Sequence, residues 1–261
     1  MRTLRYFRLP MFTLPVLAAL AAVALVTSFI SGIFGMAGGM LLIGFLLLFL
    51  PVPVAMVFHG VIQIAANGSR SWLWRHYINW KVVLQFGAGT ACALIVFSFF
   101  RFVPPKPLVL LMVGATPFVA LSVPQRFAPN IERHGQAFLA GLIGGTLQLV
   151  AGVTGPLLDI FYVRSGMTRQ VNVATKSAAM VLGHISKVVY FGVMISEPAG
   201  RDPEQWAVMG FAAVFAVVGT QLSRRLLDKM SDKQFYWWTR RVILALGALY
   251  VAQGIWQMAA T

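Results

Sequence analysis

The chain has 261 residues, of which 59% are hydrophobic and 11% carry a charge. A soluble domain has about 25% charged residues, so the seven acidic residues here are too few to keep a soluble body of this size hydrated. The net charge of +14 would suit nucleic acid, but the basic residues fall mostly between hydrophobic runs, where positive charge sets membrane topology. We therefore expect a single transmembrane domain over residues 1–261, with the lipid bilayer and not nucleic acid as its partner.

The hydrophobic segments predict an all-α, polytopic protein, because about 20 apolar residues are needed to cross about 30 Å of hydrocarbon as a helix. In chain order the segments are residues 11–31, 38–50, 52–74, 81–100, 107–123, 136–165, 170–195, 205–226 and 236–258. The first segment has some features of a signal peptide. It runs on into further apolar sequence, however, so we interpret it as an uncleaved membrane segment of a multi-pass protein in a bacterial inner membrane.

Glycine clusters interrupt two long apolar stretches. The first is residues 11–50, which contain the first two segments, and the second is residues 136–165. Glycine and proline destabilise continuous helix, so each stretch predicts a hairpin of two short helices, the second starting near Met40 or near Leu157. Non-helical backbone at membrane depth survives only where protein or water covers it. A helix that starts at such a break presents free N–H groups and a partial positive charge to an anion. The candidate positions for this contact are Gly38, Gly39 and Gly155.

The charged loops give a prediction of orientation. Residues 70–81, 164–169 and 224–233 are rich in arginine and lysine and should face the cytoplasm, whereas the acidic loop 197–205 should face outward. These placements agree with one another if residues 136–165 enter and leave the membrane on the cytoplasmic side.

An internal repeat is predicted by the two glycine clusters, which lie 117 residues apart. This offset aligns Gly35 with Gly152 and Gly38 with Gly155, and it defines repeats at residues 11–123 and 136–258. Corresponding loops fall on opposite sides of the membrane, which favours inverted over parallel repeats. Two halves with interrupted segments are typical of secondary transporters, whose substrate site lies near the breaks.

Two segments each carry a stripe of basic and amide side chains along one helical face. The stripes are His59, Gln63, Asn67 and Arg70 in the first half, and Asn172, Lys176, His184 and Lys187 in the second. Charged side chains in hydrocarbon are costly and usually face a bundle interior or a water-filled path. If the two faces converge, they surround a cavity rich in positive charge and hydrogen-bond donors, which predicts a small anionic substrate.

Four of the stripe residues also have a more ordinary explanation. Arg70, Lys176 and Lys187 lie near segment ends, where long basic side chains reach back to the interface, and His59 alone would suit a satisfied interior histidine. The repetition of the stripe at the glycine offset favours the binding site. Asp159, the acidic residue inside an apolar run, is expected to be the counter-ion of Lys176, with a proton carrier and a helix cap as alternatives.

The sequence elements GIFGMAGG at 32–39 and GVTGPLL at 152–158 are similar to those of the TauE/SafE family of sulfite and organosulfonate exporters. The elements VATKSA at 173–178 and GHISKVVYFG at 183–192 add to this resemblance, which covers nearly the whole chain in segment order. The resemblance implies a polytopic inner-membrane transporter that moves a small sulfur-containing anion outward.

Export agrees with the membrane potential. Because the cytoplasm is electrically negative, moving one negative charge outward is favoured by about 2.3 kcal/mol per 100 mV, and no coupling ion is needed. The alternatives are an importer or proton-coupled transporter of another small anion, and a passive anion channel. The chain has no HExxH, no paired acidic motif and no recognisable nucleophile constellation, so we expect no enzyme activity, metal or cofactor. The sequence leaves open whether copies associate into a homo-oligomer.

Overall fold

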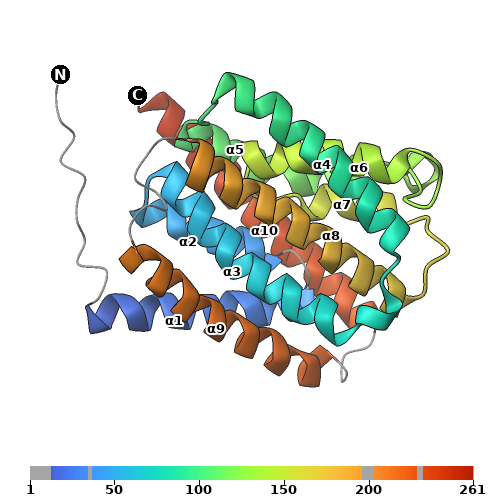
Figure 1. Cartoon of the computed structure of the whole chain (residues 1–261), viewed down its shortest axis with the longest axis horizontal. Helices are drawn as coiled ribbons and strands as arrows, with labels where there is room; N and C mark the ends of the chain where they lie inside the picture. Colours follow the sequence, from blue (N-terminus) through green and yellow to red (C-terminus); the bar gives the residue numbers. More distant parts are fainter. Residues whose placement is uncertain (1–12, 35–36, 196–202, 228–231, 261) are drawn as a thin grey trace.

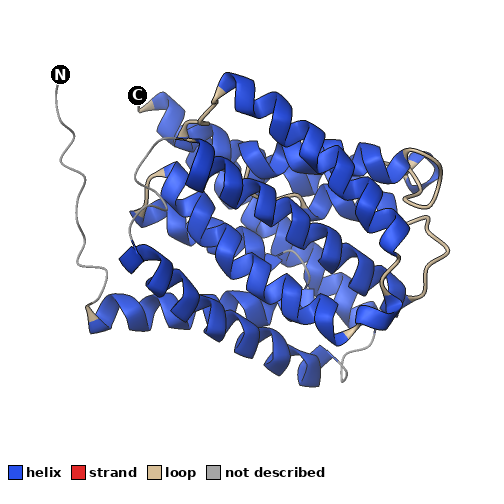
Figure 2. Ribbon diagram, viewed as in Figure 1, coloured by secondary structure: helices blue, strands red, loops and turns tan. Residues whose placement is uncertain are grey.

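The structure is a computed structural model of the chain, and it describes residues 13–34, 37–195, 203–227 and 232–260. These residues form helices and no strand. The long helices lie side by side, and most of the connecting loops lie at the two ends of the bundle (Figures 1 and 2). The all-α prediction is therefore confirmed over the described residues.

The helices follow the hydrophobic segments closely. They are α1 (Leu14–Phe34), α2 (Ala37–Phe49), α3 (Val52–Leu73), α4 (Trp80–Phe100), α5 (Lys106–Ser122), α6 (Gln136–Val150), α7 (Gly155–Tyr162), α8 (Arg169–Val189), α9 (Pro203–Leu227) and α10 (Asp232–Ala259). Short helices follow at Arg75–Tyr77 (η1), Gln125–Phe127 (η2) and Tyr190–Met194 (η3), the last of π type.

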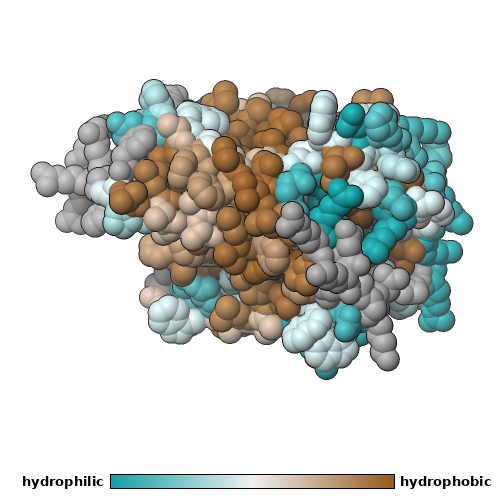
Figure 3. All heavy atoms as spheres, turned by 90° about the horizontal axis from the view of Figure 1, so that it is seen from below, coloured by the Kyte–Doolittle hydropathy of each residue, from teal (hydrophilic) through white to brown (hydrophobic). Residues whose placement is uncertain are grey.

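Within the described ranges, six helical stretches are long and apolar enough to cross a membrane. They are Leu14–Phe34, Val52–Leu73, Trp80–Phe100, Arg169–Met194, Pro203–Arg224 and Trp237–Ala259. Helices α2, α5 and α6 are apolar but shorter. Figure 3 shows a broad belt of hydrophobic side chains across one face of the molecule, with hydrophilic residues gathered mainly toward one end. These features are those of a polytopic helical membrane protein.

Both glycine-rich stretches fold as two helices. Helices α1 and α2 are joined by residues 35–36, which lie outside the described residues, as does the predicted match at Gly35. The second helices begin at Ala37 and Gly155, so the predicted starts near Met40 and Leu157 are wrong by up to three residues. Glycine is tolerated in a first helical turn, and Pro156 fits there because it has no N–H to leave unpaired. The prediction of two short helices is wrong for α1, which has 21 residues.

The turn between α6 and α7 depends on Gly152. Its φ of 75° lies in the left-handed region, where a side chain is unfavourable. A Cβ there would also lie 2.7 Å from the sulfur of Met56. This glycine therefore allows α6 to end against α3 and lets the chain turn back into α7.

Helices α3 and α8 pack against each other along much of their length. At Gly60 a Cβ would meet the Val188 side chain, so the two helices approach closely because this residue is small. Helix α9 flanks α3 and helix α4 flanks α8, while α1 packs on α9 and α6 packs on α4. The polar stripes of α3 and α8 are thereby brought to the interior of the bundle.

Candidate functional site

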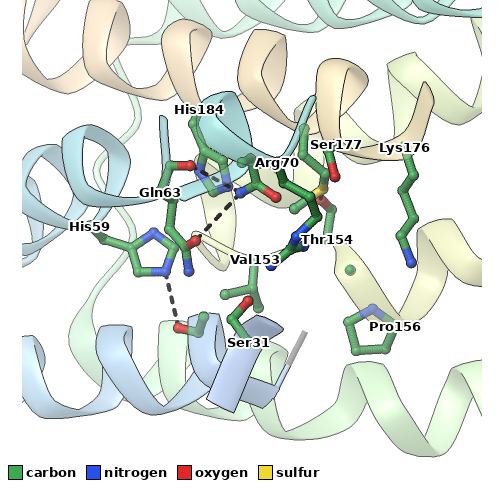
Figure 4. Close-up of a pocket in the computed structure, with 14 residues that line it drawn as sticks. Ser31, His59, Gln63, Arg70, Val153, Thr154, Pro156, Lys176, Ser177 and His184 are labelled. Carbon is green, nitrogen blue, oxygen red and sulfur yellow. Dashed lines mark hydrogen bonds between the residues drawn. The ribbon is translucent and has the colours of Figure 1, made fainter. Parts of the chain in front are cut away.

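A small polar cavity lies where α3 and α8 meet the two glycine-rich breaks (Figure 4). It is lined by Ser31, Gly39, His59, Gln63, Asn67, Arg70, Val153, Thr154, Gly155, Pro156, Lys176, Ser177, Met180 and His184. The volume that the centres of water-sized molecules can occupy in this cavity is about 40 Å³. A volume of about 10–15 Å³ on this measure holds one water. The cavity therefore has room for a few waters or one small anion.

Helix α3 contributes one continuous face to this cavity. His59, Gln63, Asn67 and Arg70 follow one another at spacings of three or four residues, which places them on one side of a helix, and all four line the cavity. Asn67 Nδ2 donates to the Gln63 backbone oxygen at 3.0 Å, which fixes the amide. The Arg70 Nη2 atom is buried and has no hydrogen-bond partner in the part of the chain that the structure describes. One guanidinium donor therefore remains available beside the cavity.

His59 links the cavity to a fully buried lysine. Its Nε2 lies 3.0 Å from the Gly39 carbonyl oxygen, and since a carbonyl only accepts, Nε2 carries the proton. The Nδ1 atom of the neutral ring is then the acceptor for Lys187 Nζ, 2.6 Å away. Lys187 Nζ also donates to the Gly152 carbonyl at 2.9 Å. Lys187 thus lies behind His59 and binds the carbonyl of the α6–α7 break.

His184 presents a second unpaired donor. Gln148 Nε2 lies 2.9 Å from His184 Nδ1, and with the amide nitrogen as donor the ring proton lies on Nε2. The Nε2 atom is buried and finds no hydrogen-bond partner among the residues described, and His184 lines the cavity. The His59 and His184 rings lie 5.5 Å apart between centroids. An anion in the cavity could accept from His184 as well as from Arg70.

Lys176 and Asp159 form an ion pair with Lys176 Nζ 2.6 Å from Asp159 Oδ1. Both side chains are partly exposed. Lys176 lines the cavity on the side opposite His59 (Figure 4), whereas Asp159 is not among the lining residues. Asp159 thus holds the lysine from outside the cavity.

The start of helix α7 borders the same cavity through Gly155 and Pro156. The partial positive charge at a helix N-terminus favours anions. Gly39, on the first turn of α2, also lines this cavity. The two helix breaks therefore border one chamber.

Eight of the residues predicted from the sequence line the cavity. They are Gly39, His59, Gln63, Asn67, Arg70, Gly155, Lys176 and His184. Gly38, Asn172 and Lys187 do not line it. At Gly38 a Cβ would overlap the Thr27 carbonyl and the Ser31 side chain, so this glycine serves the close packing of α2 on α1.

Six other lining residues were not predicted: Ser31, Val153, Thr154, Pro156, Ser177 and Met180. Four of them flank residues that were predicted, since Val153, Thr154 and Pro156 surround Gly155 and Ser177 follows Lys176. Ser31 gives no such signal, because small polar residues are common wherever membrane helices pack. Its place in the site depends on how α1 lies against α2.

The charge of the lining is one-sided. Arg70 and Lys176 line the cavity together with two histidines, and no acidic residue in the described part of the chain does. Among the described residues no group of three His, Cys, Asp or Glu side chains is placed to hold a metal ion. The lining thus combines positive charge with donors that lack protein acceptors, and a small anion would satisfy both.

The fold and this chamber define the protein as a polytopic helical membrane protein with an internal basic cavity. The family model for the sulfite exporter TauE/SafE matches residues 20–250, and the chain belongs to this family. No curated protein and no solved structure gives a match. The family places the chain among membrane transporters rather than enzymes, with a small anion as the substrate.

Proposed function

We propose that the protein exports a small sulfur-containing anion, sulfite or an organosulfonate, across a bacterial inner membrane. The observation that carries the proposal is the pair of buried donors, Arg70 Nη2 and His184 Nε2, which line one cavity and have no acceptor among the described residues. Buried donors are normally paired. A hydrogen bond to a charged group contributes about 1.5–3 kcal/mol, so an oxyanion that accepts from both would be held firmly.

The cavity suits a substrate that must be released again. Its donor groups come from different helices, with Arg70 on α3 and both Lys176 and His184 on α8. A displacement of α3 against α8 would pull these groups apart and weaken their hold on the anion. The helix breaks at its edge supply the non-helical backbone that forms substrate sites in transporter folds.

The proposal includes the two inverted repeats, residues 11–123 and 136–258. The pattern of helix packing supports them, because α1 packs on α9 as α6 packs on α4. Helices α3 and α8 pack on each other, and so do α5 and α10. An exchange of the two halves leaves this pattern unchanged, as expected for a pseudo-two-fold axis between them.

Counterflow in proteoliposomes tests the proposal. Vesicles loaded with unlabelled sulfite should accumulate labelled sulfite in a saturable manner, and Arg70→Gln should abolish the uptake. Arg75→Gln is the matched control, since Arg75 lies near the same end of α3 but is exposed and outside the cavity. A loss of counterflow in both variants, or in neither, would contradict the site.

The direction of anion transport and its coupling to protons need a second measurement. An inside-negative potential should drive efflux of the anion, and collapse of the pH gradient alone should leave the rate unchanged. Strict proton dependence, abolished by Asp159→Asn, would instead support the proton-coupled alternative. Flux that does not saturate would support a passive channel.

A further inference from the structure

A second, larger cavity lies beside the first and opens between α1, α3, α8 and α9. We call it the vestibule. It is lined by Ser31, Gly32, Ile33, Arg70, Leu73, Trp74, Arg169, Gln170, Val173, Lys176, Ser177, Thr220, Gln221, Ser223 and Arg224. The space open to the centres of water-sized molecules is about 290 Å³, against about 40 Å³ in the inner cavity.

The vestibule lies at the end of the molecule that the basic loops predict to be cytoplasmic. It includes the last residues of α3, the first residues of α8 and the last part of α9. These ends adjoin the loops at 70–81, 164–169 and 224–233, which the positive charges assign to the inside. An anion that leaves the cytoplasm would therefore reach the vestibule before the inner cavity.

The vestibule lining is strongly basic. Arg70, Arg169, Lys176 and Arg224 come from three helices, and none of the described residues that line the space is acidic. Arg224 also lies over the Trp74 ring, with its guanidinium carbon 5.7 Å from the ring centroid. A cleft lined by one sign of charge between low-dielectric walls concentrates ions of the opposite sign.

The vestibule and the inner cavity share four lining residues, Ser31, Arg70, Lys176 and Ser177. The shared arginine is the one whose Nη2 is buried without a partner. The shared lysine is partly exposed and bound to Asp159. An ion that passes from one space to the other must therefore pass an unpaired donor and a lysine held by a replaceable carboxylate.

We propose that the vestibule is an outer anion-binding site that loads the inner cavity. It takes a hydrated inorganic or sulfonate anion from the cytoplasm between Arg169 and Arg224. Lys176 then exchanges Asp159 for the anion as it moves inward, and Arg70 donates to the anion in both positions. This inference rests on the proposed function, because it assumes that an anion occupies the inner cavity.

The two sites differ in strength and in salt dependence. The wide vestibule leaves room for water around the anion, so its attraction is screened by salt. The inner cavity has room for little water, and its buried donors are screened much less. Wild-type protein should therefore bind two anions, one tightly and one weakly, and only the weak site should disappear at high salt.

The test is calorimetric binding of sulfite to purified full-length protein, combined with stopped-flow association at low salt. Arg169→Gln/Arg224→Gln should remove the weak site and slow association about tenfold, while the affinity of the tight site stays within about twofold. The control is Arg75→Gln/Arg133→Gln, which removes the same charge from exposed positions outside both cavities.

The outcomes separate the two proposals. A single tight site in wild-type protein, or two sites in Arg169→Gln/Arg224→Gln, would overturn the outer site and leave the proposed function intact. Equal slowing in the control pair would show a general field effect and would also overturn it. If wild-type protein bound neither sulfite nor an organosulfonate such as sulfoacetate, the proposed function itself would fail, and the outer site with it.

Discussion

Lys187 and His59 lie 128 residues apart in the chain, yet Lys187 Nζ donates to His59 Nδ1 over 2.6 Å in the fully buried contact between α8 and α3. The lysine also binds the Gly152 carbonyl, and the histidine binds the Gly39 carbonyl. One hydrogen-bonded chain therefore runs from the first turn of α2 to the α6–α7 break. Neither hydrogen-bond partner of Lys187 carries a negative charge. An anion in the neighbouring cavity would supply that negative charge.

Lys187→Met should weaken anion binding about tenfold. The change keeps most of the side-chain volume but removes the donor that binds His59 Nδ1 and the Gly152 carbonyl, and losing a partner in a buried hydrogen bond costs about 1–3 kcal/mol. Sulfite affinity of the purified variant is the measurement. Lys81→Met, at an exposed position at the start of α4, is the control and should bind as wild type does. If Lys187→Met bound sulfite with wild-type affinity, Lys187 would play no part in anion binding.

His184→Phe should reduce sulfite affinity by about tenfold or more, because it removes a hydrogen bond to a charged group while keeping a ring of similar shape. The exposed His76 provides the matched change, His76→Phe, which should have no effect. Thermal unfolding of both variants in detergent separates a lost donor from a misfolded protein. If His184→Phe unfolds as wild type does and still binds sulfite fully, the His184 donor plays no part in the site.

Asp159→Asn should strengthen anion binding about threefold to fivefold and slow release. The substitution frees Lys176 from its carboxylate, and a partly exposed ion pair of this kind contributes up to about 1 kcal/mol. Titrations at low and high salt should show the gain shrinking as salt rises. Unchanged or weaker binding would mean that Asp159 does not compete with the anion for Lys176.

Gly152→Ala should destabilise the protein more than Gly135→Ala does. Both glycines have a φ near 75°, so both changes carry the same conformational cost of about 1–2 kcal/mol. A Cβ at Gly152 also meets the Met56 sulfur at 2.7 Å, whereas Gly135 has open space around it. The difference between their unfolding temperatures therefore isolates the contact of the α6–α7 turn with α3. Equal unfolding temperatures would contradict that contact.

The sequence predicted the helices well because apolar length sets them directly. A helix must span the hydrocarbon, so a run such as Trp80–Phe100 has few other ways to fold. The face of α3 was also predictable, since His59, Gln63 and Arg70 recur at helical spacing in an otherwise apolar segment. Apolar length and local periodicity thus predict both the helices and the wall of the cavity that α3 forms.

The rest of the site depends on how the helices pack. Lys176 and Lys187 share one face of α8, but that face is divided between the cavity and the contact with α3, and only Lys176 reaches the cavity. Asn172 lies one turn before Lys176 and lines neither cavity. Ser31 enters the lining from α1 without any periodic signal. The way the helices cross determines that Ser31 lines the cavity and that Lys187 and Asn172 do not. Residue spacing along one helix does not encode this.

The most direct test of the central claim is to locate a bound anion in crystals. Selenite resembles sulfite in shape and charge, and the anomalous signal of selenium shows its position independently of the protein. A single strong peak within hydrogen-bond distance of Arg70 Nη2 and His184 Nε2 is the predicted result. A peak only at the protein surface, or an empty cavity in crystals that hold selenite elsewhere, would contradict it.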